Sequence, residues 1–343
     1  MRRLSEGALV SAVFAAIIDG PGAQPRYGSI DLPPRASGQT LLAVLAAPLN
    51  PLDLLIASGE FHSARHEAAY VPGSECVGVV IESDVHPIGQ TVYAELHVSP
   101  SAPGAFASLV LVGDADLIAL PDGVDPIRAA AVGNSGIAAY LPLVDSAGLR
   151  AGETVLVLGA TGAVGQLAVQ VARRLGAGRV VGVARNREAL AGLLELGVDA
   201  VVELHENEST EALAERIRAA SGPVDVVLDG IYGAPLEAAL LVTAPHARIV
   251  NVGNLAGATA VIPAGLLRGR QLTFSGFAGL HVPFAEKTAA LVWLWNAVSA
   301  GELVVTVRTV GLEELPSAWL AQAASPHAKY IVVPRQTEES DNR

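Results

Sequence analysis

The segment that most constrains the fold of this chain runs from Val155 to Gly165 and reads VLVLGATGAVG. Its first four residues are all apolar, which is typical of a parallel strand covered on both faces. Gly159, Gly162 and Gly165 then follow at intervals of three. Glycines at this spacing let the chain turn tightly, let backbone N–H groups approach a diphosphate and let the next helix pack closely on the strand. The segment therefore predicts a phosphate-binding turn followed by a helix over 163–175.

The start of that helix supplies further candidate contacts to a cofactor. A helix N-terminus carries partial positive charge and free N–H donors that favour an anion. We therefore expect Thr161 in the turn, and Ala163 and Val164 in the first helical turn, to lie with the three glycines against a dinucleotide.

Strands and helices alternate strictly through the middle of the chain. Apolar strands are predicted over 179–183, near 200, over 224–228 and over 248–252, with helices over 187–196, 211–220 and 235–242 between them. This order is typical of an α/β protein with a doubly wound parallel sheet, the Rossmann fold.

The residues on either side have a different texture. From 12 to about 123, short apolar runs are separated by Pro, Gly and Ser, which is typical of a mostly β, barrel-like unit. After 276 the pattern predicts helices near 284–299 and 312–324 and strands over 303–309 and 329–333. We predict that these pieces complete the first unit, so that a catalytic domain of residues 1–126 and 275–343 flanks a nucleotide-binding domain of residues 127–274.

Charge and cysteine content limit the partners of the chain. A net charge of −12 over 343 residues argues against nucleic-acid and anionic-membrane binding, because phosphate groups would repel most of the surface. No apolar run approaches the roughly eighteen residues of a membrane span. The single cysteine, Cys76, cannot form an intrachain disulfide and favours a cytoplasmic protein.

Short motifs occur in a fixed order along nearly the whole chain: NPLD at 50–53, PGSECVG at 72–78, GAFA at 104–107, AAAVGN at 129–134, LRAGETVLVLGATGAVG at 149–165, DVVLD at 225–229, RIVNVG at 248–253 and KYIVVP at 329–334. Together they resemble the medium-chain dehydrogenase/reductase superfamily, in its zinc-free quinone oxidoreductase branch. The resemblance implies a GroES-like, mostly β catalytic domain, a Rossmann domain that binds NAD(P)H, a cleft between them for hydride transfer, and a homodimer formed through Rossmann-domain edges.

The resemblance also maps the positions at which zinc-dependent members hold their metal. In this chain they are Asn50, Ser74 and Asn134. Two amides and a hydroxyl would bind zinc too weakly to be useful, so we expect no metal. Without a Lewis acid an alcohol is hard to activate, whereas a quinone or an α,β-unsaturated carbonyl accepts hydride at carbon and spreads the charge onto an oxygen that hydrogen-bond donors can stabilise.

Two polar residues of the NPLD motif are the candidate catalytic groups. Asn50 is the predicted donor in the nicotinamide pocket, and Asp53 is the predicted organiser or proton relay. Alternatively, Asn50 caps a turn before Pro51 and Asp53 caps the following helix. Many quinone oxidoreductases carry a tyrosine two residues after this Asp, where the chain has Leu55, which leaves the acceptor and the proton donor open.

The end of the second predicted strand indicates the nucleotide. NAD-specific Rossmann folds place a carboxylate there, but this strand ends at Ala184 and is followed by Arg185, Asn186 and Arg187. Two guanidiniums suit the 2′-phosphate of NADPH, so NADPH is predicted over NADH. Alternatively, the arginines only solubilise a helix start.

Further contacts are expected at other strand ends. Gly253 and Asn254 leave the fifth strand at the edge where ligands of open parallel sheets lie. Gly276 and Phe277 offer backbone groups to the nicotinamide carboxamide. By resemblance, Lys329 approaches the cofactor; the alternative is a surface lysine.

These observations predict an NADPH-dependent oxidoreductase that transfers hydride to a small-molecule quinone or activated enone. One alternative is enoyl-thioester or carbonyl reduction in a secondary-metabolite pathway. Another is a cofactor-binding sensor or scaffold without turnover.

Overall fold

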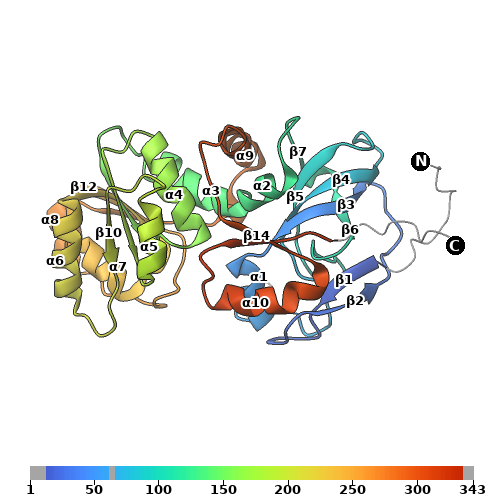
Figure 1. Ribbon diagram of the computed structural model, residues 1–343, viewed down its shortest axis with the longest axis horizontal. Coiled ribbons are helices and arrows are strands. Elements are labelled where there is room, and N and C mark those ends of the chain that lie inside the picture. Colours follow the sequence, from blue (N-terminus) through green and yellow to red (C-terminus); the bar gives the residue numbers. More distant parts are fainter. Residues whose placement is uncertain (1–12, 62–65, 335–343) are drawn as a thin grey trace. The chain divides into compact units, whose positions relative to one another are not determined.

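The computed structural model describes residues 13–61 and 66–334 of the chain (Figure 1). They divide into two compact units. The outer unit holds the described residues up to Ala131 and those from Val307 onward, and the central unit runs from Val132 to Thr306.

The central unit is built on a six-stranded sheet whose neighbouring strands are all parallel. Its strand order is β10-β9-β8-β11-β12-β13, so the order reverses on either side of β8, as in a Rossmann fold. The strands are β8 (Thr154–Leu158), β9 (Arg179–Ala184), β10 (Ala200–Glu203), β11 (Val224–Asp229), β12 (Thr243–Asn251) and β13 (Thr273–Gly276). The helices are α3 (Asn134–Leu141), α4 (Ala163–Arg174), α5 (Arg187–Leu193), α6 (Thr210–Ser221), α7 (Gly233–Leu240), α8 (Ala264–Arg270) and α9 (Phe284–Ser299). The predicted doubly wound sheet is therefore confirmed.

Helix α9 lies in the central unit, whereas we predicted that residues 275–306 would belong to the catalytic domain. The physical reason is its packing against α3. A Cβ added at Gly136 of α3 would lie 2.8 Å from Leu294 Cδ1 of α9, and Tyr140 stacks on Trp293 with ring centroids 4.4 Å apart. The glycine lets the two helices approach closely, so the divisions fall at 131/132 and 306/307 rather than at 126 and 274.

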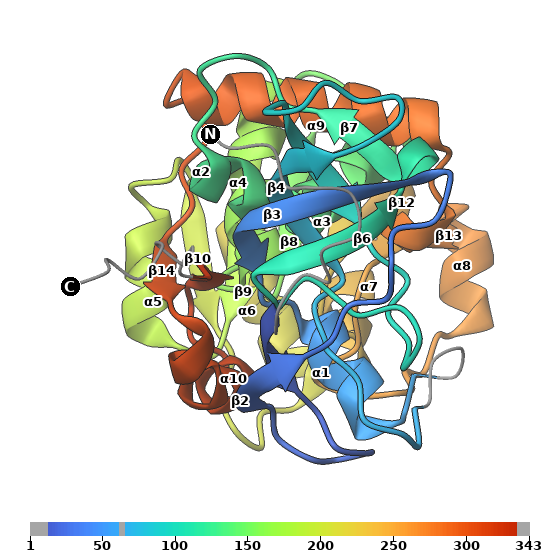
Figure 2. The same cartoon turned by 90° about the vertical axis from the view of Figure 1, so that its right-hand side faces the viewer.

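The outer unit is built mainly from antiparallel strands. Its large sheet has the order β14-β15-β3-β4-β5-β7, with β6 paired to β3, and β1 and β2 form a separate antiparallel pair. Figure 2 shows β6 beside β3. The strands are β1 (Val13–Ile17), β2 (Arg26–Ile30), β3 (Gln39–Pro48), β4 (Glu75–Glu82), β5 (Thr91–Glu95), β6 (Leu109–Gly113), β7 (Leu117–Ala119), β14 (Val307–Val310) and β15 (Lys329–Val332). The helices are α1 (Pro51–Ser58), α2 (Pro126–Ala131) and α10 (Leu315–Ala323). As predicted, the C-terminal strand β15 returns to this unit, where it pairs with β3.

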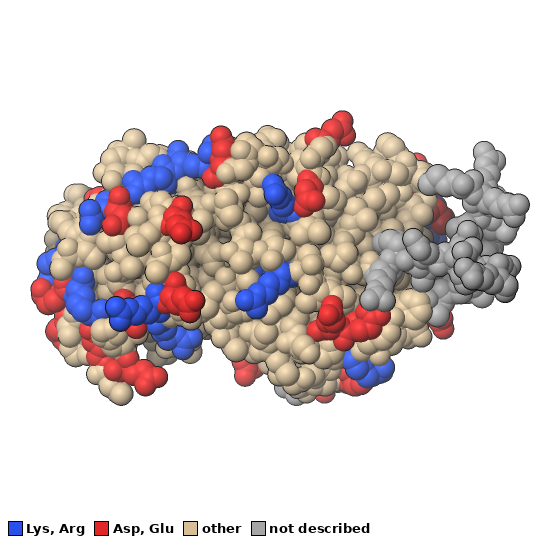
Figure 3. Space-filling view, viewed as in Figure 1, with Lys and Arg blue, Asp and Glu red and all other residues tan. Residues whose placement is uncertain are grey.

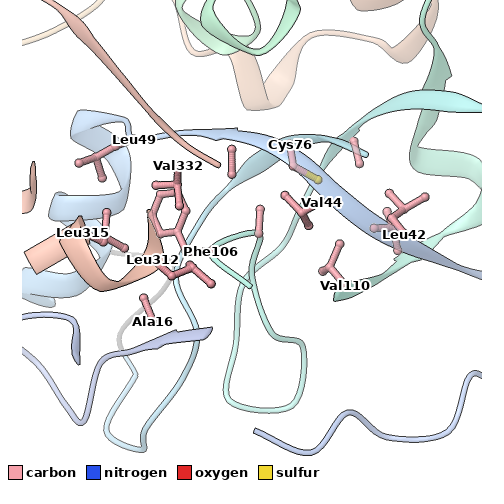
Figure 4. Close-up of a cluster of buried hydrophobic side chains, with 14 of the residues drawn as sticks. Ala16, Leu42, Val44, Leu49, Cys76, Phe106, Val110, Leu312, Leu315 and Val332 are labelled. Carbon is pink, nitrogen blue, oxygen red and sulfur yellow. The ribbon is translucent and has the colours of Figure 1, made fainter. Parts of the chain in front are cut away.

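The core of the outer unit joins residues from both ends of the chain. Figure 4 shows Leu42 and Val44 of β3 with Leu315 of α10 and Val332 of β15 in one buried cluster. Cys76 of β4 belongs to it and is fully buried. Because burial raises the pKa of Cys76 to about 12, its side chain stays a neutral thiol and acts as a small apolar core residue.

The described surface is mixed in charge. On the face drawn in Figure 3, Lys and Arg side chains are interspersed with Asp and Glu and do not merge into one basic field. Within residues 13–61 and 66–334, no helix combines the length and the apolar character that crossing a bilayer requires.

Candidate functional site

The glycine turn of the central unit leads from β8 directly into α4. Gly159 has φ +80°, a conformation that side-chain-bearing residues rarely adopt. A Cβ at Gly165 would lie 2.4 Å from Gly159 O and 2.5 Å from Ala160 Cα, so only glycine allows the helix to sit this close to the turn. No side chain caps the N-terminus of α4 in the described chain. A turn of this shape, with backbone donors at a helix N-terminus, fits a diphosphate.

The carboxyl ends of the central strands lie in register at one edge of the sheet. Leu158 of β8 pairs with Asp229 of β11, Asp229 with Asn251 of β12, and Asn251 with Gly276 of β13. The glycine turn and the predicted contacts at Gly253, Asn254 and Phe277 therefore follow neighbouring strand ends. This is the edge at which open parallel sheets bind their ligands.

Asp229 and Asn251 tie the loops at this edge together. Asn251 Nδ2 donates to Asp229 Oδ2 at 2.8 Å and to Gly253 O at 2.7 Å. Asp229 Oδ1 accepts the backbone N–H groups of Ile231 and Tyr232, and burial raises the pKa of this carboxyl. We did not single out Asp229 as a site residue, although an acidic residue ending the apolar run VDVVLD was the available signal.

The residues after β9 divide into two kinds. Arg185 and Arg187 are exposed and make no ion pair with any described residue, so both guanidiniums are available to an anion. Asn186 instead caps α5, since its Oδ1 accepts the N–H of Ala189 at 2.9 Å. Ala184 is the last residue of β9 and is buried.

The outer unit contains a buried polar cluster around Asn50. Asn50 Nδ2 donates to Glu75 Oε1 at 2.7 Å, Tyr93 Oη donates to Glu75 Oε2 at 2.6 Å, and Lys329 Nζ donates to Asn50 Oδ1. All four residues are at most 2% exposed. The Lys329 ammonium can only donate and the Glu75 carboxylate accepts. The Asn50 amide must therefore turn its oxygen toward Lys329 and its nitrogen toward Glu75.

Asp53 belongs to the same cluster through backbone donors. Its Oδ2 accepts the N–H of Asn50 at 2.8 Å, and its Oδ1 accepts the N–H of Ser74 at 3.0 Å. Burial raises its pKa to about 6; the Asn50 N–H, the Ser74 side chain and Lys329 oppose the rise, and Glu75 adds to it. Asp53 does cap the start of α1, because its carboxylate accepts the Asn50 N–H. The Asn50 side chain instead points into the polar cluster, where it donates to Glu75.

Burial is also the main influence on Lys329. It lowers the pKa of the ammonium group, while Glu75 and Asp53 act in the opposite direction. Lys329 is 2% exposed, so the surface-lysine alternative is wrong. Counted with Ser74, this cluster has six residues. Two of them, Glu75 and Tyr93, were not among our candidates.

Comparison with known proteins adds family information to this geometry. Residues 36–122 match the model of the alcohol dehydrogenase GroES-like domain, and residues 163–296 match that of the zinc-binding dehydrogenase. The human quinone oxidoreductase is 28% identical over 251 residues, which cover 72% of this chain and 74% of that protein. A probable oxidoreductase from Mycobacterium abscessus, whose crystal structure is known, is 27% identical with a TM-score of 0.78, over 94% of this chain and 99% of that one.

The chain belongs to the medium-chain dehydrogenase/reductase superfamily. Within that superfamily it belongs to the quinone oxidoreductase-like branch. A further relative is the spectinabilin polyketide synthase system protein NorB of Streptomyces orinoci, which is 36% identical over 307 residues. That match covers 88% of this chain but only 13% of NorB.

The zinc of the metal-dependent members of the superfamily does not fit the residues of this chain. Asn50 Oδ1 faces the Lys329 ammonium, a cation that repels a second cation. Ser74 offers a neutral hydroxyl, and Asn134, the first residue of α3, a neutral amide. No group of three His, Cys, Asp or Glu side chains suited to a metal occurs within the described ranges. Zinc sites need thiolate or imidazole ligands, and Asn50, Ser74 and Asn134 supply neither.

Proposed function

We propose that the protein is an NADPH-dependent oxidoreductase that passes hydride to a quinone or an α,β-unsaturated carbonyl compound without a metal. The observation that carries this proposal is that Asn50, which by resemblance stands at a zinc-ligand position of metal-dependent relatives, accepts a hydrogen bond from the buried Lys329, while the glycine turn of the Rossmann unit is retained. The similarity to quinone oxidoreductases supports the choice of acceptor.

Asn50 is the proposed donor to the acceptor oxygen. Asn50 Nδ2 donates one hydrogen to Glu75, and its only other acceptor among the described residues is Pro48 O at 3.4 Å, a long and weak bond. Nδ2 can therefore turn its second hydrogen toward a developing oxyanion without breaking a strong bond. Lys329 and Glu75 hold the amide in that orientation in advance, which is what electrostatic stabilisation of a transition state requires.

The cofactor is proposed to lie along the carboxyl edge of the central sheet. When bound, NADPH supplies the hydride from its nicotinamide ring. The proposed contacts are Gly159, Thr161, Gly162, Ala163, Val164 and Gly165 for the diphosphate, Ala184, Arg185, Asn186 and Arg187 for the adenosine end, and Gly253, Asn254, Gly276 and Phe277 for the nicotinamide end. Lys329 is proposed to act through Asn50 and not through the diphosphate.

The preference for NADPH is expected to depend on Arg185 and Arg187. Replacing both by alanine should lower the ratio of kcat/KM for NADPH over NADH by roughly 100-fold, because two charge-assisted hydrogen bonds to the 2′-phosphate are lost. Steady-state kinetics with both nucleotides measures the ratio. Arg268→Ala, at an exposed position of α8, is the matched control and should leave it unchanged. An undiminished preference in the double variant would remove the proposed role of the two arginines.

Reduction of an enoyl thioester is the second candidate function. The observation that favours it is the higher identity to the polyketide synthase system protein, 36% against 28% for the human quinone oxidoreductase. Polyketide intermediates are acyl thioesters, and an enoyl thioester accepts hydride at carbon just as an enone does. The same polar cluster would serve both reactions.

NADPH oxidation against two acceptor panels separates these functions. Turnover of quinones or simple enones supports the first function, and turnover of acyl thioesters alone supports the second. Tight NADPH binding with no turnover on either panel would contradict both and leave a sensor or scaffold.

We also propose that the protein is a cytoplasmic homodimer joined through the β13 edge of the central sheet. Within the described residues β13 pairs only with β12, and Leu255 and Val261 of the same unit are 75% and 72% exposed. An open strand edge and exposed apolar residues on the same unit are typical of a subunit contact. Light scattering should give about twice the chain mass of 35.1 kDa; a single-chain mass at micromolar concentration would contradict the dimer.

A further inference from the structure

Two buried hydroxyl groups near Asp53 lack a hydrogen-bond partner among the described residues. They are Tyr70 Oη and Ser74 Oγ, which lie in the segment leading into β4. Leaving a hydroxyl buried without a partner costs about 1–3 kcal/mol. Where such groups persist in a rigid site, an ordered water or a ligand oxygen is the usual partner.

The backbone around both hydroxyls is held firmly. Tyr70 exchanges two backbone hydrogen bonds with Ile18, at 2.9 and 3.0 Å, and is 5% exposed within the core cluster of the outer unit. Gly73 lies against the neighbouring loop so tightly that an added Cβ would be 2.7 Å from Phe106 N. The backbone that carries the two hydroxyls is therefore fixed and does not turn them toward solvent.

Ser74 contacts the Asp53 carboxyl, and the charge of Asp53 in turn acts on Tyr70. The Ser74 N–H donates to Asp53 Oδ1 at 3.0 Å, and the Ser74 side chain acts to lower the pKa of Asp53. Burial, followed by the charge of Asp53, raises the pKa of Tyr70 to about 12. Each Asp53 oxygen accepts one backbone N–H, and a carboxylate has about four acceptor positions. Positions for a further donor therefore remain on Asp53.

We propose that Tyr70 Oη and Ser74 Oγ hold a water molecule against Asp53, and that this water delivers the proton that completes reduction of the acceptor. This inference rests on the proposed function and names its proton source. It accounts for two orphaned hydroxyls in a chain where Leu55, at 40% exposure, offers no hydroxyl of its own.

The proton transfer balances without a further reactant. Hydride adds to the acceptor carbon, and the electron pair of the conjugated system moves to the acceptor oxygen. The bound water gives a proton to that oxygen, or to the carbon next to the carbonyl, and takes one from the carboxylic acid form of Asp53. Solvent then returns a proton to Asp53. Tyr70 stays protonated throughout and orients the water as a donor.

The charged and titratable groups that face Asp53 come from three elements and one loop. Glu75 of β4, hydrogen-bonded to Tyr93 of β5, and Lys329 of β15 act on it in opposite directions, and Tyr70 stands in the loop before β4. Burial, with a smaller contribution from Glu75, raises the pKa of Asp53 to about 6, so that a fraction of this carboxyl stays protonated near neutral pH, as a general acid requires.

Tyr70→Phe and Ser74→Ala test the proposal. Tyr70→Phe keeps the ring and removes only the hydroxyl, so packing is preserved. We expect kcat to fall by about 10- to 100-fold, within the lower range of general acid catalysis because bulk water can partly substitute. The solvent deuterium isotope effect on kcat should rise as proton transfer becomes limiting, and NADPH affinity should stay unchanged. Tyr27→Phe, at a 39% exposed tyrosine of β2, is the matched control.

A high-resolution crystal structure of the wild-type protein gives the second readout. We expect an ordered water within hydrogen-bond distance of Tyr70 Oη and Asp53, and its loss in Tyr70→Phe. A wild-type structure without that water, or an active Tyr70→Phe variant with unchanged kcat and isotope effect, would overturn the proposal while leaving the proposed function intact. If no acceptor is turned over at all, the relay fails together with the proposed function, and the crystal structure alone decides whether the water is bound.

Discussion

Replacing Lys329 by methionine is expected to lower the free energy of unfolding by about 3–5 kcal/mol at pH 7.5, because breaking a buried ion cluster leaves uncompensated charge. Asp53 and Glu75 are both buried, and Lys329 is the cation that acts on them. Methionine fills much of the same volume, so the loss reports on charge and hydrogen bonding more than on packing. Asn50 Oδ1 also loses its donor.

The pH dependence of that loss identifies its cause. The pKa of Asp53 is raised from 3.8 to about 6 by folding, so its favourable contribution is complete below 3.8 and is lost as the pH rises through 6. Without Lys329 the pKa of Asp53 rises further. At pH 5 the carboxyl is then protonated in the variant, and the stability deficit relative to wild type should shrink.

Thermal and urea unfolding at pH 7.5 and pH 5 measure the effect. Arg26→Met, which breaks the exposed ion pair with Asp19, is the control and should hardly move the midpoint. Adding Glu75→Gln to Lys329→Met should recover part of the loss, because it removes one of the two carboxylates. A deficit that is as small as that of Arg26→Met, or that is equal at both pH values, would contradict a charge-balancing role for Lys329.

The Rossmann unit could be predicted from sequence because its signals are local. The apolar run of β8, the glycine spacing and the alternation that follows are each written within a few residues, and every predicted strand from 179 to 252 occurs. Boundaries were less well defined: β12 begins at Thr243 and not at 248, and α8 was not anticipated. The sequence AGLLRGR of α8 contains two glycines and no fully buried residue, so its helical pattern is weak.

The polar cluster could be predicted only in part because its members are far apart in the chain. Asn50 and Lys329 are 279 residues apart, and their contact depends on β15 pairing with β3. Asn50 and Asp53 were found through a motif. A signal for Glu75 was present, since its carboxylate directly precedes the apolar run CVGVVI of β4, but nothing local shows that Tyr93 on the neighbouring strand donates to it. The placement of α9 likewise depends on a long-range contact, that of Leu294 with Gly136.

The second large effect is expected at the glycine turn. In Gly165→Ala the new Cβ would overlap backbone atoms, 2.4 Å from Gly159 O and 2.5 Å from Ala160 Cα, so α4 must move away from the turn. We expect a stability loss of about 1–3 kcal/mol from overpacking and a fall in NADPH affinity of roughly 100-fold or more, because the donors at the helix N-terminus are displaced.

Gly162→Ala separates cofactor binding from folding. Gly162 has φ −75°, which suits any residue, and its added Cβ would meet only Gly159 O at an ordinary 3.5 Å. The methyl group therefore costs the fold little. It would stand on the exposed side of the turn, where a diphosphate must approach the backbone, so we expect NADPH affinity to fall by about tenfold or more with an unchanged melting temperature.

Titration of NADPH into the wild type, Gly162→Ala and Gly192→Ala tests most directly whether the dinucleotide lies on the turn from Gly159 to Gly165. Gly192 is the matched control, because it lies in α5 with nothing within 4 Å of an added Cβ. Binding followed by nicotinamide fluorescence should show tight binding to the wild type and Gly192→Ala, and at least about tenfold weaker binding to Gly162→Ala at equal thermal stability. Equal affinity of all three proteins for NADPH would contradict a diphosphate site on this turn.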